Sequence, residues 1–294
     1  MSNLPKRAKL GIVLVVTLAL VGCGFAFPPG LAHIQLPAEA VASPFGFPIT
    51  NTILATWLAM AVLVGLSWAA TRNMKEVPTG LQNLVEMAVE YLANLVNDVA
   101  GKERGRKFFP LVATIFIFIL VANWMGLMPL FGTFGLYHEV HGEHGEARVL
   151  VPFLRSAATD LNTTLGLALI SVVTIQVFGV RSLGFKGYAS RFVNLRGPLD
   201  MFVGLLELIS EFAKIISLSF RLFGNIFAGE VLLGVIGFLM PWVAIVPFMG
   251  LELFVGAMQA FIFAMLTLVF LVSATTSHEG AHEGAHETAR EGAH

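Results

Sequence analysis

The sequence has few charged residues and almost no cysteine. Charged side chains make up 13% of its 294 residues, whereas soluble domains carry roughly 25%. The single cysteine, Cys23, excludes an intramolecular disulfide and a zinc site built from several cysteines. A net charge of −1 provides no basic surface for nucleic acid. The chain also lacks a Gly-x-x-x-x-Gly-Lys-Ser/Thr loop for binding phosphates, so we expect no nucleotide or other cofactor.

Long apolar segments take the place of these features. Hydrophobic residues make up 56% of the chain, and the mean hydropathy is +0.79. A helix needs about 20 apolar residues to cross a bilayer. Six segments have about this length or more: 10–27, 49–70, 108–130, 161–180, 199–239 and 241–276. The sequence therefore predicts an all-α polytopic membrane protein, with five core membrane helices and an extra N-terminal span.

Residues 1–30 have two interpretations. A basic start is followed by an apolar run that ends in Leu-Val-Gly-Cys at residues 20–23. This pattern is similar to a lipoprotein cleavage site, so the segment is either a cleaved signal peptide or a signal-anchor that remains as the first span. Both interpretations leave the orientation of the later spans unchanged.

Residues 79–100, between the second and third spans, have the pattern of an amphipathic helix. The apolar set is Leu84, Met87, Ala88, Tyr91, Leu92 and Leu95, and the acidic set is Glu86, Glu90 and Asp98. We expect this helix to lie in the membrane interface or against a partner.

The positions of lysine and arginine predict the orientation, because cytoplasmic loops carry an excess of both. With a cytoplasmic N-terminus, fourteen of the eighteen fall on the cytoplasmic side. The opposite side holds only Arg148 and Arg155, and the fifth span contains Lys214 and Arg221. We therefore expect six spans with both chain ends in the cytoplasm.

The last two spans are too long to stand upright. At 1.5 Å per residue, 199–239 is roughly 60 Å long and 241–276 roughly 54 Å, whereas the hydrocarbon core is about 30 Å thick. We expect a long, tilted, antiparallel helix hairpin over residues 199–276. Within it Glu207, Lys214 and Arg221 recur every seven residues. They share one broad helix face with a further set of polar residues: Ser210, Glu211, Ser217 and Asn225.

The turn of this hairpin predicts which polar residues lie at one depth. Glu230 and Glu252 are equally far from residue 241, and Arg221 and Gln259 form a deeper level. We expect two polar clusters, one reachable from each side, with Arg221 between them. Because two nearby carboxylates in a low-dielectric site are not both ionised, we expect Glu230 and Glu252 to share a proton.

Several of the polar residues have a structural alternative, since membrane bundles also use such side chains as packing contacts. This applies to Asn162, Thr163, Thr164, Asn225 and Gln259. Arg221 is different, because it lies deep in its span and cannot lose its proton. Ionisable residues at such positions are functional candidates.

Three stretches together resemble one known family. They are "SLSFRLFGNIFAGE" (217–230), "MQAFIFAMLTLVF" (258–270) and "RSAATDLNTTLGLAL" (155–169). The sequence resembles subunit a of F-type ATP synthases over residues 45–276, and "GLQNLVEMAVEYL" (80–92) is similar to that family's cytoplasmic amphipathic helix. The resemblance implies a non-catalytic channel subunit with two offset half-channels, which deliver protons to and from the carboxylates of a rotor ring.

The resemblance also implies roles for individual residues, with no metal site among them. Arg221 matches the family's essential arginine, with Asn225 and Gln259 beside it. The outer half-channel set is Glu230, Glu252, Asp160 and Asn162, and the inner set is Glu207, Ser210, Glu211, Lys214 and Ser217. Two features depart from the family pattern. Glu252 stands where many relatives have histidine, and "AKIISL" (213–218) lacks a common proline.

The partners implied by the resemblance are a ring of c subunits, peripheral-stalk b subunits, the remainder of the complex and the lipid bilayer. The implied location is the bacterial inner membrane. The sequence leaves open whether the coupling ion is H⁺ or Na⁺, because the ring is another chain.

The tail, residues 277–294, suggests a competing class. His278 to His282 and His282 to His286 match H-E-x-x-H, the zinc-binding motif of metalloproteases, but no apolar residues surround them to build a pocket. We expect a disordered tail, with incidental metal binding as an alternative. A secondary transporter, the third class considered, would show inverted repeats, and none is apparent.

Overall fold

The computed structural model describes residues 37–42, 48–78, 80–128, 131–132, 134–142, 145–192, 198–239 and 245–276. The predicted N-terminal span and the His/Glu-rich tail lie outside these ranges. Within them, five helices are long and apolar enough to cross a membrane. They are α2 (Asn51–Thr71), α4 (Lys102–Gly126), α5 (Leu161–Phe192), α6 (Pro198–Leu239) and α7 (Ile245–Thr275). The expected polytopic helical fold is therefore confirmed for the core spans.

Two of these helices extend beyond the predicted segments. α4 begins at Lys102 rather than 108, so its first turns carry charged residues and only the later turns are apolar. α5 continues to Phe192 across a break at Gly184, whose φ of 73° is left-handed. Glycine adopts this conformation without a Cβ clash, so the chain changes direction there. α6 continues unbroken through residues 213–218.

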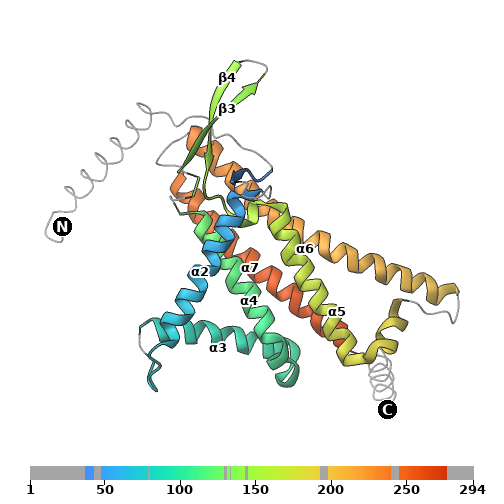
Figure 1. Ribbon diagram of the computed structural model, residues 1–294. Helices are drawn as coiled ribbons and strands as arrows, with labels where there is room; N and C mark the ends of the chain where they lie inside the picture. The colour runs from blue at the N-terminus through green and yellow to red at the C-terminus, as the bar shows by residue number, and fades with distance from the viewer. Residues whose placement is uncertain are drawn as a thin grey trace, which may run out of the picture. The chain divides into compact units, whose positions relative to one another are not determined.

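The predicted amphipathic helix is α3 (Leu81–Ala100). It lies between two glycines with positive φ, Gly80 and Gly101, and the N–H of Gly101 donates to the carbonyl of Asn97 at 2.8 Å. Figure 1 shows α3 running across the direction of α4. One face of its C-terminal half is packed inside the protein, with Val96 only 1% exposed, whereas Tyr91 on another face is 64% exposed.

Two short antiparallel sheets were not predicted from the sequence. β1 (Ala40–Ala42) pairs with β2 (Ile49–Thr50), and β3 (Gly135–Gly142) pairs with β4 (Gly145–Pro152). In the longer hairpin Gly135 lies opposite Pro152 and Gly142 opposite Gly145. Figure 1 shows this hairpin extending away from the helices of its unit. It contains the histidine-rich stretch 137–148.

The chain divides into two compact units. Unit 1 comprises Met1–Ala59, Val121–Asp160 and Phe223–Met258, and unit 2 comprises Met60–Leu120, Leu161–Leu222 and Gln259–His294. The division passes through α6 directly after Leu222. Each unit thus contains segments that are distant in the sequence, and each carries part of the predicted site.

The hydrophobic core of unit 2 is formed by α3, α4, α5 and α7. Val96, Val112, Ile175 and Leu268 are at most 2% exposed. The unit also contains a buried hydrogen bond of 2.8 Å between the hydroxyls of Ser171 and Thr267, which is a common form of contact between membrane helices.

In unit 1, α4 and α7 are joined by side-chain hydrogen bonds to backbone. The Asn123 amide donates to the carbonyl of Gly256 at 3.1 Å, and the Trp124 indole N–H donates to that of Leu253 at 3.0 Å. A Cβ at Gly256 would lie 3.2 Å from the Cβ of Asn123. The absence of a side chain at residue 256 therefore allows the two helices to approach closely.

Candidate functional site

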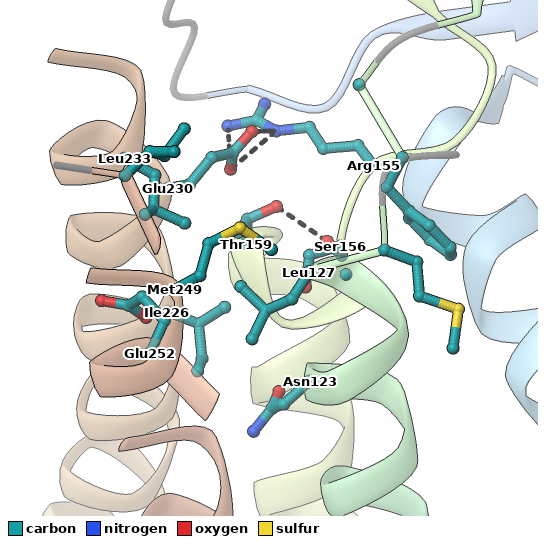
Figure 2. Close-up of a pocket in the computed structure, with 15 residues that line it drawn as sticks. Asn123, Leu127, Arg155, Ser156, Thr159, Ile226, Glu230, Leu233, Met249 and Glu252 are labelled. Carbon is teal, nitrogen blue, oxygen red and sulfur yellow. Dashed lines mark hydrogen bonds and ion pairs between the residues drawn. The ribbon is translucent and has the colours of Figure 1, made fainter. Parts of the chain in front are cut away.

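A hollow of about 360 Å³ in unit 1 is bordered by the helices α4, α6 and α7 and by the segment that precedes α5 (Figure 2). Most of its lining is apolar. The polar side chains in the lining are Asn123, Arg155, Ser156, Thr159, Glu230 and Glu252. Two residues predicted for the outer half-channel, Glu230 and Glu252, therefore line the same hollow, as the hairpin register implied.

An ion pair lies at one end of this hollow. Figure 2 shows the Arg155 and Glu230 side chains pointing toward each other. Arg155 Nε lies 3.1 Å from Glu230 Oε1 and 3.2 Å from Oε2, and Nη2 lies 3.2 Å from Oε2. The guanidinium is also 5.9 Å from the ring centroid of Phe227. Arg155 is 7% exposed, and the side chain of Glu230 is 40% exposed, so the arginine is buried and the carboxylate faces partly outward.

The sequence analysis missed Arg155, which it counted only as a loop charge. The signal was its position at the start of the 155–169 stretch that resembles the family. The expected shared proton between Glu230 and Glu252 gains no support, because both oxygens of Glu230 accept hydrogen bonds from Arg155. The two carboxylates line one hollow, but Glu230 has a different partner.

Glu252 is 7% exposed on α7. Its carboxylate lies directly against Gly229, where any Cβ would collide with it. The carboxylate therefore occupies space that only a glycine on α6 leaves open. Glu252 still lines the hollow, so a buried acid group borders space large enough for water.

Two buried polar atoms also border this hollow. Among the described residues, Ser156 Oγ and Asn123 Oδ1 have no hydrogen-bond partner. Buried polar groups are normally satisfied by protein or by ordered water. Since a water molecule occupies about 30 Å³ of liquid volume, the hollow has room for several. The hollow therefore offers polar groups and room for water along an otherwise apolar lining.

The two remaining residues of the predicted outer set are not part of the hollow's lining. Asp160 is 6% exposed and accepts a hydrogen bond of 2.8 Å from the Thr52 hydroxyl, which joins α2 to the segment before α5. Asn162 is exposed on α5 in unit 2. The structure therefore gives Asp160 a clear structural contact.

Arg221 lies on α6 at the border of a second hollow, of about 270 Å³, in unit 2. Its side chain is exposed, and Nη2 donates to the Ser217 hydroxyl at 3.1 Å. The polar lining consists of Ser210, Lys214, Ser217 and Arg221, and α7 contributes Leu266 and Phe270. Four members of the predicted polar stripe thus share one helix face.

A third hollow, of about 290 Å³ in unit 2, is bordered by α5 and α6. Glu211 lines it and forms an ion pair with Lys214, with 2.6 Å between Nζ and Oε1. Lys214 Nζ also lies 4.9 Å from the ring centroid of Phe270. The Gln176 amide donates to Glu211 Oε2 at 2.7 Å, and the Tyr188 hydroxyl donates to Gln176 Oε1. The sequence analysis singled out neither Gln176 nor Tyr188.

The other predicted residues differ in exposure. Asn225 is exposed on α6, Glu207 is half-buried there, and Gln259 is 2% exposed on α7. In the part of the chain that the structure describes, no group of three or more His, Cys, Asp or Glu side chains is placed to hold a metal ion. The H-E-x-x-H matches of the tail lie outside that part.

Comparison with known proteins gives consistent matches. The family described as ATP synthase A chain matches residues 53–272. ATP synthase subunit a of Gloeobacter violaceus is 38% identical over 229 residues, which cover 78% of this chain and 85% of that protein. ATP synthase subunit a of Moorella thermoacetica is 33% identical over 233 residues, which cover 79% of this chain and 93% of that protein. This chain therefore belongs to the ATP synthase A chain family.

Proposed function

We propose that this chain is the stator subunit that conducts protons in the membrane sector of an F-type ATP synthase. Arg221 is the observation that carries the proposal. Its guanidinium lies exposed on a long apolar helix, and among the described residues it has no carboxylate partner. An unpaired charge at membrane depth costs at least a few kcal/mol. A carboxylate on another chain, in a ring of rotor c subunits, would supply the missing partner.

The outer half-channel in this proposal is the hollow of unit 1. Protons enter it past Glu230 and Glu252, and ordered water connects the two. Arg155 holds Glu230 at the border of the hollow, and Gly229 makes room for the Glu252 carboxylate. Both carboxyl groups border space large enough for water, which a proton relay requires.

The inner half-channel is formed by the polar residues of unit 2. Lys214, Ser217 and Ser210 line the hollow that also contains Arg221. Glu211 is paired with Lys214 and borders the neighbouring hollow. Protons released on this side leave along these groups toward the cytoplasm.

Arg221 separates the two paths electrostatically. A permanent cation repels a proton that moves directly from one path to the other, and it favours the ionised form of each arriving ring carboxylate. A proton therefore crosses the membrane only while bound to a carboxylate of the rotating ring. The membrane potential drives this proton transfer with about 2.3 kcal/mol per charge per 100 mV. This chain carries out no covalent step.

The remaining partners are proposed on the same basis. Peripheral-stalk b subunits would hold the chain against rotation, and the exposed apolar side chains of α3, Leu84 and Met87 among them, would lie in the interface or against such a partner. We place the complex in the inner membrane of a bacterium, with the spans in the orientation that the lysine and arginine distribution favours.

The test uses the assembled complex in vesicles. We expect Arg221→Ala to abolish ATP synthesis driven by a proton gradient while the chain stays inserted. Arg221→Lys should also fail, since a desolvated lysine can lose its proton and a guanidinium cannot. Synthesis at the parent rate in a fully assembled Arg221→Ala complex would refute the proposal. Synthesis driven by a sodium gradient alone would assign Na⁺ as the coupling ion.

A further inference from the structure

The ion pair between Glu211 and Lys214 stands between the two hollows of unit 2. Glu211 lines the hollow beside α5, and Lys214 lines the hollow that contains Arg221. The two side chains are 2.6 Å apart, and both are largely buried, with side-chain exposures of 12% and 19%. The two members of one buried ion pair therefore line two different hollows.

The Glu211 carboxylate is held from two sides. Lys214 contacts Oε1, and the Gln176 amide donates to Oε2 at 2.7 Å. The Tyr188 hydroxyl donates to Gln176 Oε1. Because an ionised carboxylate can only accept hydrogen bonds, the amide nitrogen of Gln176 faces it, and the amide oxygen is left to accept from the tyrosine. Tyr188 thus holds the other end of the Gln176 amide in place.

The break in α5 makes this arrangement possible. In a straight helix, residues 176 and 188 would be about 18 Å apart along the axis. The left-handed conformation of Gly184 turns the chain so that Tyr188 reaches Gln176. The tyrosine ring is 5% exposed and packs against Gly179, where a Cβ would collide with it. Two glycines therefore permit one hydrogen bond.

We propose that Gln176 and Tyr188 are positioning residues of the inner proton path, which hold the Glu211 carboxylate where it passes protons between the two hollows. The proposal rests on the proposed proton-conducting function and adds two residues from α5. In this proposal the proton binds a carboxylate oxygen of Glu211 from water in the hollow beside α5 and leaves past Lys214 toward the hollow that contains Arg221. Lys214 keeps its proton, and no covalent bond forms.

The physical reason is the freedom of the glutamate side chain. A free glutamate side chain samples many rotamers, and ordering it has an entropic cost. Lys214, three residues further along the same helix, contacts only one oxygen of the Glu211 carboxylate. The second contact, from α5, fixes the plane of the carboxylate. Without it the group remains paired with Lys214 but is not aligned with both hollows.

The test measures passive proton conduction through the membrane sector of the assembled complex in vesicles, with a pH-sensitive dye. Gln176→Met keeps the size of the side chain and removes both hydrogen bonds. We expect conduction to fall roughly tenfold, since hydrogen bonds to charged groups are among the stronger ones in proteins. Tyr188→Phe removes only the hydroxyl, so its effect should be smaller. Tyr91→Phe, the same change at an exposed site on α3, is the matched control.

Two further measurements distinguish positioning from packing. In a Glu211→Gln background, Gln176→Met should cause no additional loss, because its effect acts through Glu211. Gln176→His should conduct protons faster than Gln176→Met, because one ring nitrogen can donate to Glu211 while the other accepts from Tyr188. A purely structural role would give additive losses and no rescue.

The result also separates this proposal from the proposed function. If the parent conducts protons and Arg221→Ala abolishes proton-driven ATP synthesis, but Gln176→Met and Tyr188→Phe conduct like the parent, the positioning role is wrong and the function stands. If the parent itself does not conduct protons, both are wrong. Where Gln176→Met reduces assembly, the rate per assembled complex in Tyr188→Phe decides.

Discussion

A buried arginine is tolerated where other groups replace the water it loses, and Arg155 has such groups. Its guanidinium contacts both oxygens of Glu230 and faces the Phe227 ring. Charge-assisted contacts of this kind are the stronger class of hydrogen bond. Glu230 thereby has a fixed position at the border of the hollow, while its partial exposure leaves it open to water. The ion pair thus orients the acid.

We predict that Arg155→Leu slows passive proton conduction by roughly tenfold, because the loss of one partner leaves the other charge without compensation. Arg155→Lys should be milder, since it keeps the charge but loses the forked geometry. Conduction is measured per assembled complex. The charge-reversed double variant, Arg155→Glu with Glu230→Arg, tests the pairing itself. If the double variant conducts no faster than the two single losses together predict, the contact between the two side chains is not what matters for conduction.

At the scale of elements, glycines determine how closely helices approach. Gly229 on α6 makes room for the Glu252 carboxylate, and Gly256 on α7 lies against Asn123 of α4. Both contacts are within unit 1. Close approach through small residues is a main source of helix association in membranes, where lipid offers no hydrophobic driving force.

We predict that Gly256→Leu destabilises the protein by about 1–3 kcal/mol, the usual cost of overpacking. The new side chain would separate α7 from α4 and break the hydrogen bond from Asn123. The control is Gly250→Leu on the same helix, where a Cβ meets no atom within 4 Å. The measurement is the thermal midpoint of the detergent-solubilised complex. Equal midpoints for the two variants would show that the close approach at residue 256 is unimportant.

At the scale of the whole molecule, each unit has its own polar hollow, and α6 contributes residues to both units. The described part of the chain ends with α7, and the matched family region ends at residue 272. The histidine-rich tail follows this region. The lining that the structure describes for these hollows comes from residues that precede the tail.

We predict that deletion of residues 278–294 leaves assembly and proton-driven ATP synthesis nearly unchanged, because the last span is complete before them. The comparison uses parent and truncated complexes in the same vesicles, with and without added zinc. If a stably inserted, truncated chain loses coupled synthesis, the tail histidines have a role that the membrane helices do not supply.

The sequence by itself determined the helical membrane architecture and the face that polar residues share on α6. Apolar runs of spanning length predict α2, α6 and α7 to within a few residues, because bilayer thickness sets a minimum length. The seven-residue spacing of Lys214 and Arg221 places them on one face of α6, since side-chain direction in a helix follows from spacing alone.

Only the tertiary structure decided the partners of the charged groups. Arg155 and Glu230 are 75 residues apart, and no local pattern relates them. Gln176 and Tyr188 meet because of the left-handed turn at Gly184, whereas helical periodicity would place them three turns apart. Spacing along one helix is a local property, but contacts between helices depend on how the chain folds back, so the sequence pattern gave the faces and the fold gave the pairs.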